Sequence, residues 1–302
     1  MPIAEPKKPI NGILLLNKPQ GITSNKALQK AKGLYQAKKA GHTGSLDPLA
    51  TGMLPICFGE ATKICQYFLD ADKCYQTTGI LGVKTNTSDS TGEITHQVDE
   101  FTISSAELNL VLDKYKGDIE QVPSMFSALK HKGRPLYHYA RNGQEIQRPA
   151  RKISISELSL EQFDGVHFDL MVLCSKGTYI RNLVEDIGES LNVGAHVSRL
   201  HRVYTSGFEN KPMYSLEELA ELSEGQRLEC LIPMDTAIDY FPSLVLADEE
   251  VLVLRQGRIL SAHLPPQNNV EQLRLYDKTK QFIGLGDRLE NGDIKVKRLL
   301  SF

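Results

Sequence analysis

Residues 41–55 read Gly41-His42-Thr43-Gly44-Ser45-Leu46-Asp47-Pro48-Leu49-Ala50-Thr51-Gly52-Met53-Leu54-Pro55. Three glycines and two prolines surround a single aspartate, which predicts an irregular backbone rather than an ordinary helix or strand. Asp47 precedes a proline and is biased towards an extended or turn conformation, and its apolar neighbours Leu46 and Leu49 predict packing against a core. A carboxylate held there loses hydration unless a cation pairs with it. Asp47 is therefore a candidate nucleophile or general base, although an aspartate that only caps a turn fits the same pattern.

The composition is that of a globular protein. The 302 residues are 41% hydrophobic and 24% charged, and this length predicts about two domains. No apolar run reaches the roughly 18 residues of a membrane span, and residues 1–10 lack the apolar segment of a secretion signal. The five cysteines form no CxxC pair, which favours reduced thiols and a cytoplasmic location over disulfides or a zinc site.

The charges are segregated along the chain, although the formal net charge is only −2. Residues 24–40 hold five lysines and no acid, and residues 130–152 hold seven Lys or Arg against the single Glu145. Residues 205–250 hold eleven acids against Lys211 and Arg227. A charge run is most often a solvated surface. Two acid-poor basic runs on either side of the Asp47 loop nevertheless favour contact with RNA phosphates.

Periodicity and capping residues predict a mixture of strands and helices. Strands are expected at 10–17, 75–83, 153–160 and 166–174, the last two joined at Asp164-Gly165. Helices are expected from Thr23 or Ser24, at 60–69, from Ser104 or Ser105 to Tyr115, and at 179–190, with a polar loop at 85–92. From about Ala247 the pattern changes to short strands at 273–276 and 281–285, followed by an Asn291-Gly292 hairpin signal.

Residues 122–151 form a long, irregular and basic stretch that includes Phe126, Tyr137 and Tyr139. Stretches of this length inside a compact domain are functional or disordered, and interleaved basic and aromatic residues suit a grip on nucleic acid. The alternative is a helix–turn segment whose aromatic rings pack inward.

Several stretches resemble, in order, the motifs of the tRNA pseudouridine synthase B family. Residues 41–55 are similar to its catalytic motif and residues 15–24 to its opening motif. Leu81-Gly82 with Thr85, Thr87, Asp89 and Gly92 resembles its second motif, Lys176–Arg181 its third, and Arg199-Leu200 with Gly207-Phe208 the segment that closes the pocket. The resemblance extends from about Ile10 to about Asp239.

The resemblance implies an α+β pseudouridine synthase fold, with a mixed, largely antiparallel sheet flanked by helices and a small C-terminal PUA-like β-barrel. Residues 1–245 are expected to form the catalytic domain, with 122–152 as an RNA-clamping insertion, and residues 246–302 the PUA-like RNA-binding domain. The implied reaction converts uridine 55 in the T-loop of tRNA to pseudouridine after base flipping. No cofactor, metal, membrane or obligatory protein partner is implied, and a monomer is expected.

The same resemblance implies roles for individual residues. Asp47 is the nucleophile, Arg181 keeps its carboxylate ionised, and Tyr75 stacks on the base and relays a proton. The implied substrate contacts are His42, Tyr75, Tyr179, Leu200, Lys18 and Pro19, and the implied RNA contacts are Lys130, Lys132, Arg134, Arg141, Arg148 and Arg151. Without the resemblance, Arg181 fits an ordinary helical ion pair with Glu185, and the tyrosines, His42 and Leu200 fit core packing.

Three other functions remain open at this point. The scaffold fits a non-catalytic RNA-binding protein, and a relative that acts on ribosomal RNA would carry the same motifs. A nucleotide-binding enzyme with a phosphate cradle at Gly41–Gly44 is disfavoured, because the spacing matches neither GxxxxGK[ST] nor GxGxxG. Whether Asp47 attacks the base, attacks the sugar carbon or promotes a glycal also stays open.

Overall fold

The computed structural model describes residues 7–261, 264–265 and 269–301. The central element of the fold is an eight-stranded sheet. Its strands lie in the order β1-β3-β12-β4-β11-β10-β7, and β2 pairs with β3. The only parallel pairing among these named neighbours joins β12 to β3; the others are antiparallel. The bounds are β1 (Gly12–Lys18), β2 (Ala40–His42), β3 (Thr51–Phe58), β4 (Lys73–Leu81), β7 (Gly117–Gln121), β10 (Arg151–Phe163), β11 (His167–Cys174) and β12 (Ala195–Thr205). The predicted mixed, largely antiparallel sheet is confirmed.

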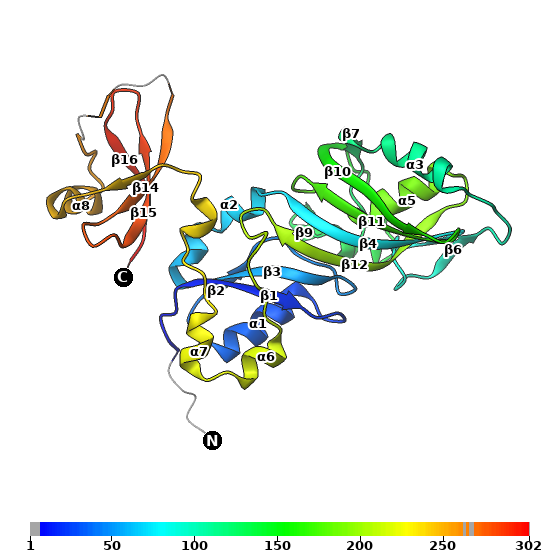
Figure 1. Cartoon of the computed structure of the whole chain (residues 1–302), viewed down its shortest axis with the longest axis horizontal. Coiled ribbons are helices and arrows are strands. Elements are labelled where there is room, and N and C mark those ends of the chain that lie inside the picture. The colour runs from blue at the N-terminus through cyan, green and yellow to red at the C-terminus, as the bar shows by residue number, and fades with distance from the viewer. Residues whose placement is uncertain (1–6, 262–263, 266–268, 302) are drawn as a thin grey trace.

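Helices cover this sheet at both of its ends (Figure 1). α1 (Ser24–Leu34), α6 (Leu216–Glu221) and α7 (Glu224–Glu229) lie beside β1, while α3 (Ser105–Asp113) and α5 (Ile180–Ser190) lie towards β10. The predicted caps are present: Thr23 Oγ1 accepts from Lys26 N at 3.1 Å, and Ser104 forms a capping box with Glu107. α1, α3, α5 and α6 bury their apolar faces, including Leu28, Leu108 and Leu183, in one core, whereas α7 has no buried residue.

Two predictions in the first half of the chain are wrong. Residues from Thr51 onward are not irregular but form β3, in which Gly52 adopts a φ of +96° and lies against the backbone of β12. The helix expected at 60–69 is divided at Ile64 into the 3₁₀ helix η1 (Gly59–Lys63) and α2 (Cys65–Asp70). The expected polar loop at 85–92 is confirmed and is flanked by the short hairpin of β5 (Val83–Thr85) and β6 (Ile94–Gln97).

A second sheet, in the order β13-β14-β15-β16, forms the C-terminal part and has its own small core. Its strands are β13 (Ser243–Val245), β14 (Glu271–Tyr276), β15 (Phe282–Arg288) and β16 (Ile294–Leu299), preceded by η2 (Thr236–Ile238). The Asn291-Gly292 hairpin and the small PUA-like fold are confirmed. The sequence predicted a change to short strands from about Ala247, but the helix α8 (Asp248–Arg255) comes first, and its Glu250 accepts a hydrogen bond from Ala247 N. The strands resume only at β14.

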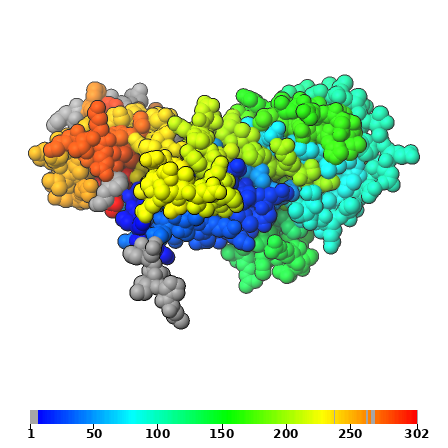
Figure 2. Space-filling model, turned by 60° about the horizontal axis from the view of Figure 1, so that its bottom comes forward, coloured from blue at the N-terminus to red at the C-terminus, as the bar shows by residue number. Residues whose placement is uncertain are grey.

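The segment 122–150 contains short elements rather than a structureless loop. β8 (Lys130–His131) and β9 (Arg134–Pro135) form a hairpin whose turn residues, Lys132 and Gly133, both have positive φ, and α4 (Leu136–Ala140) follows. Leu136 packs inward, whereas the side chain of Tyr137 is exposed. In the space-filling view this segment forms a green lobe beside the blue N-terminal elements (Figure 2). No helix within the described residues has both the length and the apolar character required to cross a membrane.

Candidate active site

The loop that carries Asp47 is fixed to the beginning of α1. The buried hydroxyl of Ser24 donates to Leu46 O at 2.9 Å and accepts from Leu46 N at 2.7 Å. Gly21 N donates to Pro48 O at 2.7 Å, which ties the loop to the turn that precedes α1. Gly44 adopts a φ of +78°, a region that favours glycine. These contacts therefore fix the backbone on both sides of Asp47, and with it the position of the carboxylate.

Arg181, in the first turn of α5, reaches the Asp47 carboxylate from the other side. Its Nε lies 2.9 Å from Asp47 Oδ2, and its Nη1 lies 3.5 Å from Asp89 Oδ2. The guanidinium also donates to the backbone carbonyls of Thr87 at 2.8 Å and Phe126 at 3.2 Å. One arginine thus joins two carboxylates, the polar loop and the start of the inserted segment.

The alternative partner for Arg181 is excluded by this geometry. Glu185 instead accepts from the hydroxyl of Ser88 at 2.6 Å. The ion pair expected between Arg181 and Asp47 is therefore present, and the ordinary helical pair is not.

Burial and charge act in opposite directions on Asp47. Burial raises the pKa of its carboxyl group, and the like charge of Asp89 raises it further, while Arg181 and Lys18 lower it. The Arg181 and Asp89 side chains are each only 5% exposed, but the Asp47 side chain keeps 40% of its surface accessible. Asp47 is thus the part of this network that remains open to an incoming molecule.

Asp47 opens into a cavity of about 380 Å³. Tyr75 of β4, Leu200 of β12 and Tyr179 at the start of α5 line it together with Arg181. Residues Ser127, Ala128 and Leu129 of the inserted segment complete its wall. The structure thus brings five of the predicted site residues around one space: Asp47 from its loop, Tyr75 from β4, Leu200 from β12, and Tyr179 and Arg181 from the start of α5.

Tyr179 is held by a reciprocal pair of hydrogen bonds that the sequence did not predict. Its backbone N donates to Gln121 Oε1 at 2.8 Å, and Gln121 Nε2 donates to its carbonyl at 3.1 Å. Burial raises the pKa of the Tyr179 phenol, as it does for Tyr75. The phenol groups of both tyrosines are therefore protonated and neutral at physiological pH.

Three predicted substrate contacts lie outside the described lining of this cavity, namely Lys18, Pro19 and His42. Lys18 Nζ donates to Pro19 O at 2.9 Å and to Ile22 O at 2.8 Å, and burial lowers its pKa to about 8. Its ammonium group therefore fixes the turn before α1. His42 is a half-buried residue of β2, and burial lowers its pKa.

Two residues beside the site were not assigned a role from the sequence. Asp89 sits in the polar loop, where its Oδ1 accepts from Thr91 N at 3.0 Å while its Oδ2 faces Arg181. Arg202 of β12 lines the cavity beside Tyr75. Asp89 lies within one of the family motifs recognised in the sequence, so a role at the site could have been predicted for it. Nothing in the sequence around Arg202 marks it as a site residue.

Five of the six predicted RNA-contacting residues lie in the segment 122–150, and Arg151 is the first residue of β10. Lys130, Lys132, Arg134, Arg141 and Arg151 are exposed, whereas Arg148 is partly buried and lies 3.8 Å from Glu145. Arg141 also lies over the ring of Tyr137, at 5.6 Å from its centroid. Five of the six are accessible to a phosphate backbone.

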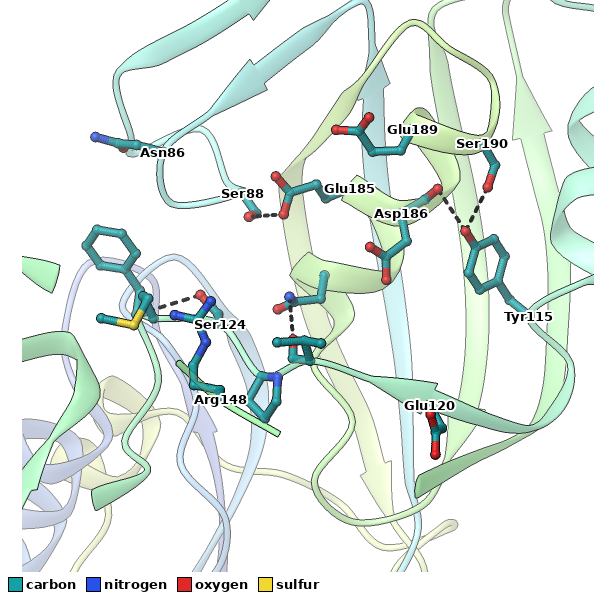
Figure 3. Close-up of a pocket in the computed structure, with 15 residues that line it drawn as sticks. Asn86, Ser88, Tyr115, Glu120, Ser124, Arg148, Glu185, Asp186, Glu189 and Ser190 are labelled. Atoms are coloured by element: carbon teal, nitrogen blue, oxygen red, sulfur yellow. Dashed lines mark hydrogen bonds between the residues drawn. The ribbon is translucent and has the colours of Figure 1, made fainter. Parts of the chain in front are cut away.

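A larger cavity, of about 630 Å³, lies beside α5 (Figure 3). Arg148 faces it from one wall, and Glu185, Asp186 and Glu189 face it from the helix. Burial and the two neighbouring glutamates raise the pKa of Asp186 to about 6. With Glu120, four carboxylates line this cavity and repel phosphate, so the smaller cavity beside Asp47 is the better place for a nucleotide.

Comparison with known proteins agrees with this architecture. The profile of the "TruB family pseudouridylate synthase (N terminal domain)" matches residues 32–180. The profiles "tRNA pseudouridylate synthase B C-terminal domain" and "Pseudouridine synthase II TruB, C-terminal" match residues 181–239 and 242–300.

Individual relatives match along the whole chain. A tRNA pseudouridine synthase B of Legionella pneumophila (strain Lens) is 62% identical over 302 residues, covering 100% of this chain and 99% of its own. One from Tolumonas auensis is 48% identical over 302 residues, covering 96% and 92%. Among solved structures, an H/ACA RNP bound to a substrate RNA containing 2′-deoxyuridine matches with a TM-score of 0.73 at 21% identity, covering 96% of this chain and 85% of that one.

The fold and these matches define the class: the protein is a pseudouridine synthase, an enzyme that isomerises uridine in RNA. The chain belongs to the TruB family of pseudouridylate synthases. The family resemblance expected from the motifs is therefore confirmed.

Proposed function

We propose that this enzyme converts uridine 55 in the T-loop of tRNA to pseudouridine, with Asp47 as the nucleophile. The observation that carries this proposal is the 2.9 Å contact between Arg181 Nε and Asp47 Oδ2 at the wall of a 380 Å³ cavity. The curated relatives are named tRNA pseudouridine synthase B, which supports tRNA as the substrate. An unstacked base in an RNA loop is also what proteins recognise most readily.

The cavity suits a single extruded nucleotide. Pockets of a few hundred Å³ bury one small ligand, so the uridine would leave the RNA stack before it meets Asp47. Tyr75 and Tyr179 offer flat, neutral surfaces for the uracil ring, and Leu200 adds an apolar contact. We assign these three residues to substrate binding.

Arg181 has two tasks in this mechanism. Its charge opposes the effect of burial and favours the ionised form of Asp47, which is the form that can attack. Its Nε contact with Asp47 Oδ2 also orients this carboxylate at the wall of the cavity. Attack on the base, attack on the sugar carbon and a glycal route all require this ionised carboxylate.

The basic residues of segment 122–152 would hold the RNA over the cavity. Residues 127–129 of the same segment line the cavity, so RNA bound to Lys130, Lys132 or Arg134 lies next to the opening. Phosphate contacts of this kind contribute affinity and position rather than sequence specificity. We assign the described part of 246–302 to a further RNA contact.

We propose that the enzyme acts as a monomer without an obligatory protein partner. We place the reaction in the cytoplasm, since the five cysteines are free thiols.

The test is release of tritium from uracil C5 of a T-arm transcript and of a ribosomal RNA fragment, assayed side by side. Wild-type enzyme is expected to release tritium from the T-arm alone, at one equivalent per target uridine. Asp47→Asn is expected to abolish release while RNA affinity stays within about twofold, since Asn keeps the shape without the charge. Asp113→Asn, at a surface carboxylate paired with Lys116, is the matched control with wild-type activity.

Release from ribosomal RNA alone would overturn the substrate assignment. Continued turnover by Asp47→Asn would remove Asp47 from its role. Binding without turnover by the wild-type protein would favour the non-catalytic RNA-binding alternative.

A further inference from the structure

Gln121, the last residue of β7, is 4% exposed and binds the backbone of Tyr179 with both ends of its side-chain amide. Tyr179 N donates to Gln121 Oε1 at 2.8 Å, and Gln121 Nε2 donates to Tyr179 O at 3.1 Å. An amide side chain carries a donor and an acceptor, so it can bind both polar groups of one residue at once. Two bonds of opposite direction fix the place and the orientation of the Tyr179 backbone.

The contact lies where α5 begins. Tyr179 is the residue before this helix, and its own side chain makes no capping hydrogen bond. The first N–H groups of a helix lack partners within the helix, and Tyr179 O already accepts from Leu183 N at 3.1 Å, in the first turn. Gln121 therefore takes the place of a capping residue from a separate strand.

The entry to the inserted segment is at the same point. Gln121 pairs with Arg151 of β10, so the segment 122–150 leaves the sheet and returns to it beside this amide. A second hydrogen bond runs in the opposite sense, because Asn182 Nδ2 of α5 donates to Val122 O at 3.1 Å. The first turn of α5 and the beginning of the segment are thus joined from both sides.

Both joined parts reach the catalytic cavity. Tyr179 lines it on one side, and residues 127–129 of the segment line it on the other. Gln121 is not part of the described lining, so any effect that it has on a bound nucleotide must act through Tyr179.

We propose that Gln121 is a positioning residue that holds Tyr179 in the cavity wall at a fixed place relative to the RNA-binding segment. The segment holds the RNA, and Tyr179 meets the extruded uracil, so Gln121 relates the position of the bound RNA to the position of the base. This inference rests on the proposed function, because it requires RNA on the segment and a uracil in the cavity.

Gln121→Met tests this role, because methionine keeps the length of the side chain and lacks the amide. Single-turnover rates at saturating T-arm RNA and RNA affinities are measured on full-length chains, at a temperature at which every variant is folded. A misplaced contact of about 1 Å costs up to about 100-fold in rate, so the variant should lose at least about tenfold in rate and keep its Kd within about twofold. A lower Tm with an unchanged rate would overturn the proposal, since it would show a purely structural role.

A double-mutant cycle tests whether the effect passes through Tyr179. The same measurements are made for Tyr179→Ala, which removes the ring, and for Gln121→Met/Tyr179→Ala. Because both changes act on one ring, the double variant should be no slower than the slower single variant. Rate losses that multiply would overturn the proposal.

Tyr115→Phe is the matched control on the same helix. The Tyr115 hydroxyl donates to Asp186 O at 2.8 Å, towards the other end of α5 (Figure 3). Tyr115 lies between α3 and β7, outside the catalytic cavity and outside both parts assigned to RNA binding. The control should lower Tm and leave the rate unchanged. An equal rate loss in Tyr115→Phe would overturn the proposal, because any weakening of α5 would then slow the reaction.

Amide hydrogen exchange tests the contact if Gln121→Met does not fold. In full-length protein labelled with 15N-tyrosine, the Tyr179 amide is the signal that Tyr179→Phe removes. Its N–H is bonded to a buried oxygen, so it should exchange at least about 100-fold more slowly than in an unfolded peptide. Exchange at the unfolded rate would overturn the proposal. This readout does not depend on RNA, so a wild-type enzyme inactive on T-arm RNA would refute the proposed function and leave this test intact.

Discussion

Arg181→Met is predicted to damage stability and catalysis through separate mechanisms. The substitution preserves the length and helix preference of the side chain but leaves the Asp89 carboxylate, 5% exposed, without its cation. Loss of one partner of a buried pair costs about 3–5 kcal/mol. At about 2 °C per kcal/mol, the Tm of the variant should fall by roughly 6–10 °C. The rate should fall at least about 100-fold, because Asp47 loses the contact that orients it.

The pH dependence of the variant follows from the direction of the pKa shift. In the wild type, burial raises the pKa of Asp47 and Arg181 lowers it. Without Arg181 the effect of burial is unopposed, so the pKa of Asp47 rises further and a smaller fraction is ionised at a given pH. The acid limb of the pH–rate profile should therefore move to higher pH, and the rate loss should be larger at about pH 6 than at about pH 8.5.

The assay is single-turnover tritium release across this pH range, with thermal unfolding of the same samples. Arg181→Met/Asp89→Asn is the informative control, since it removes both buried charges and keeps the acceptor for Thr91 N. This double variant should regain part of the lost Tm. Because removal of the Asp89 charge lowers the pKa of Asp47, it should also regain part of the rate at about pH 6, but not the rate lost at about pH 8.5, where Asp47 still lacks the contact that orients it. Recovery of the rate at about pH 8.5 would refute the reasoning, as would an acid limb of the Arg181→Met profile that does not move.

Two further predictions concern the loop and the RNA-binding segment. Ser24→Ala removes both hydrogen bonds to Leu46 in a buried site, so the free energy of unfolding, measured by heat or urea, should fall by about 1–3 kcal/mol and the reaction rate should also fall. Ser105→Ala, at an exposed serine in the first turn of α3, should change neither the free energy of unfolding nor the rate. Replacing Lys130, Lys132 and Arg134 by Gln should weaken T-arm affinity and flatten the plot of log Kd against log salt by about 0.7–0.9 per lost phosphate contact, and an unchanged slope would argue against contact with RNA.

Much of the fold followed from local patterns in the sequence. The caps at Thr23 and Ser104, the antiparallel pair 153–174 and the Asn291-Gly292 hairpin all depend on side chains within a few residues of each other, and each was confirmed. The failures have tertiary causes. Residues 51–58 form a strand rather than irregular backbone because β1 and β12 pair with them on either side. The helix expected at 60–69 is divided at Ile64, which is fully buried.

By itself the sequence determined the local chemistry: an aspartate in a rigid Gly/Pro-rich loop, the family motifs around it, and separate basic and acidic stretches. The tertiary structure alone decided which charges meet. Arg181 binds Asp47, 134 positions away, rather than Glu185 in its own helix, and it shares its charge with Asp89. The tertiary structure also buried Arg202 beside Tyr75. The physical reason is that electrostatic interactions depend on distance and burial, which chain folding sets and residue spacing does not.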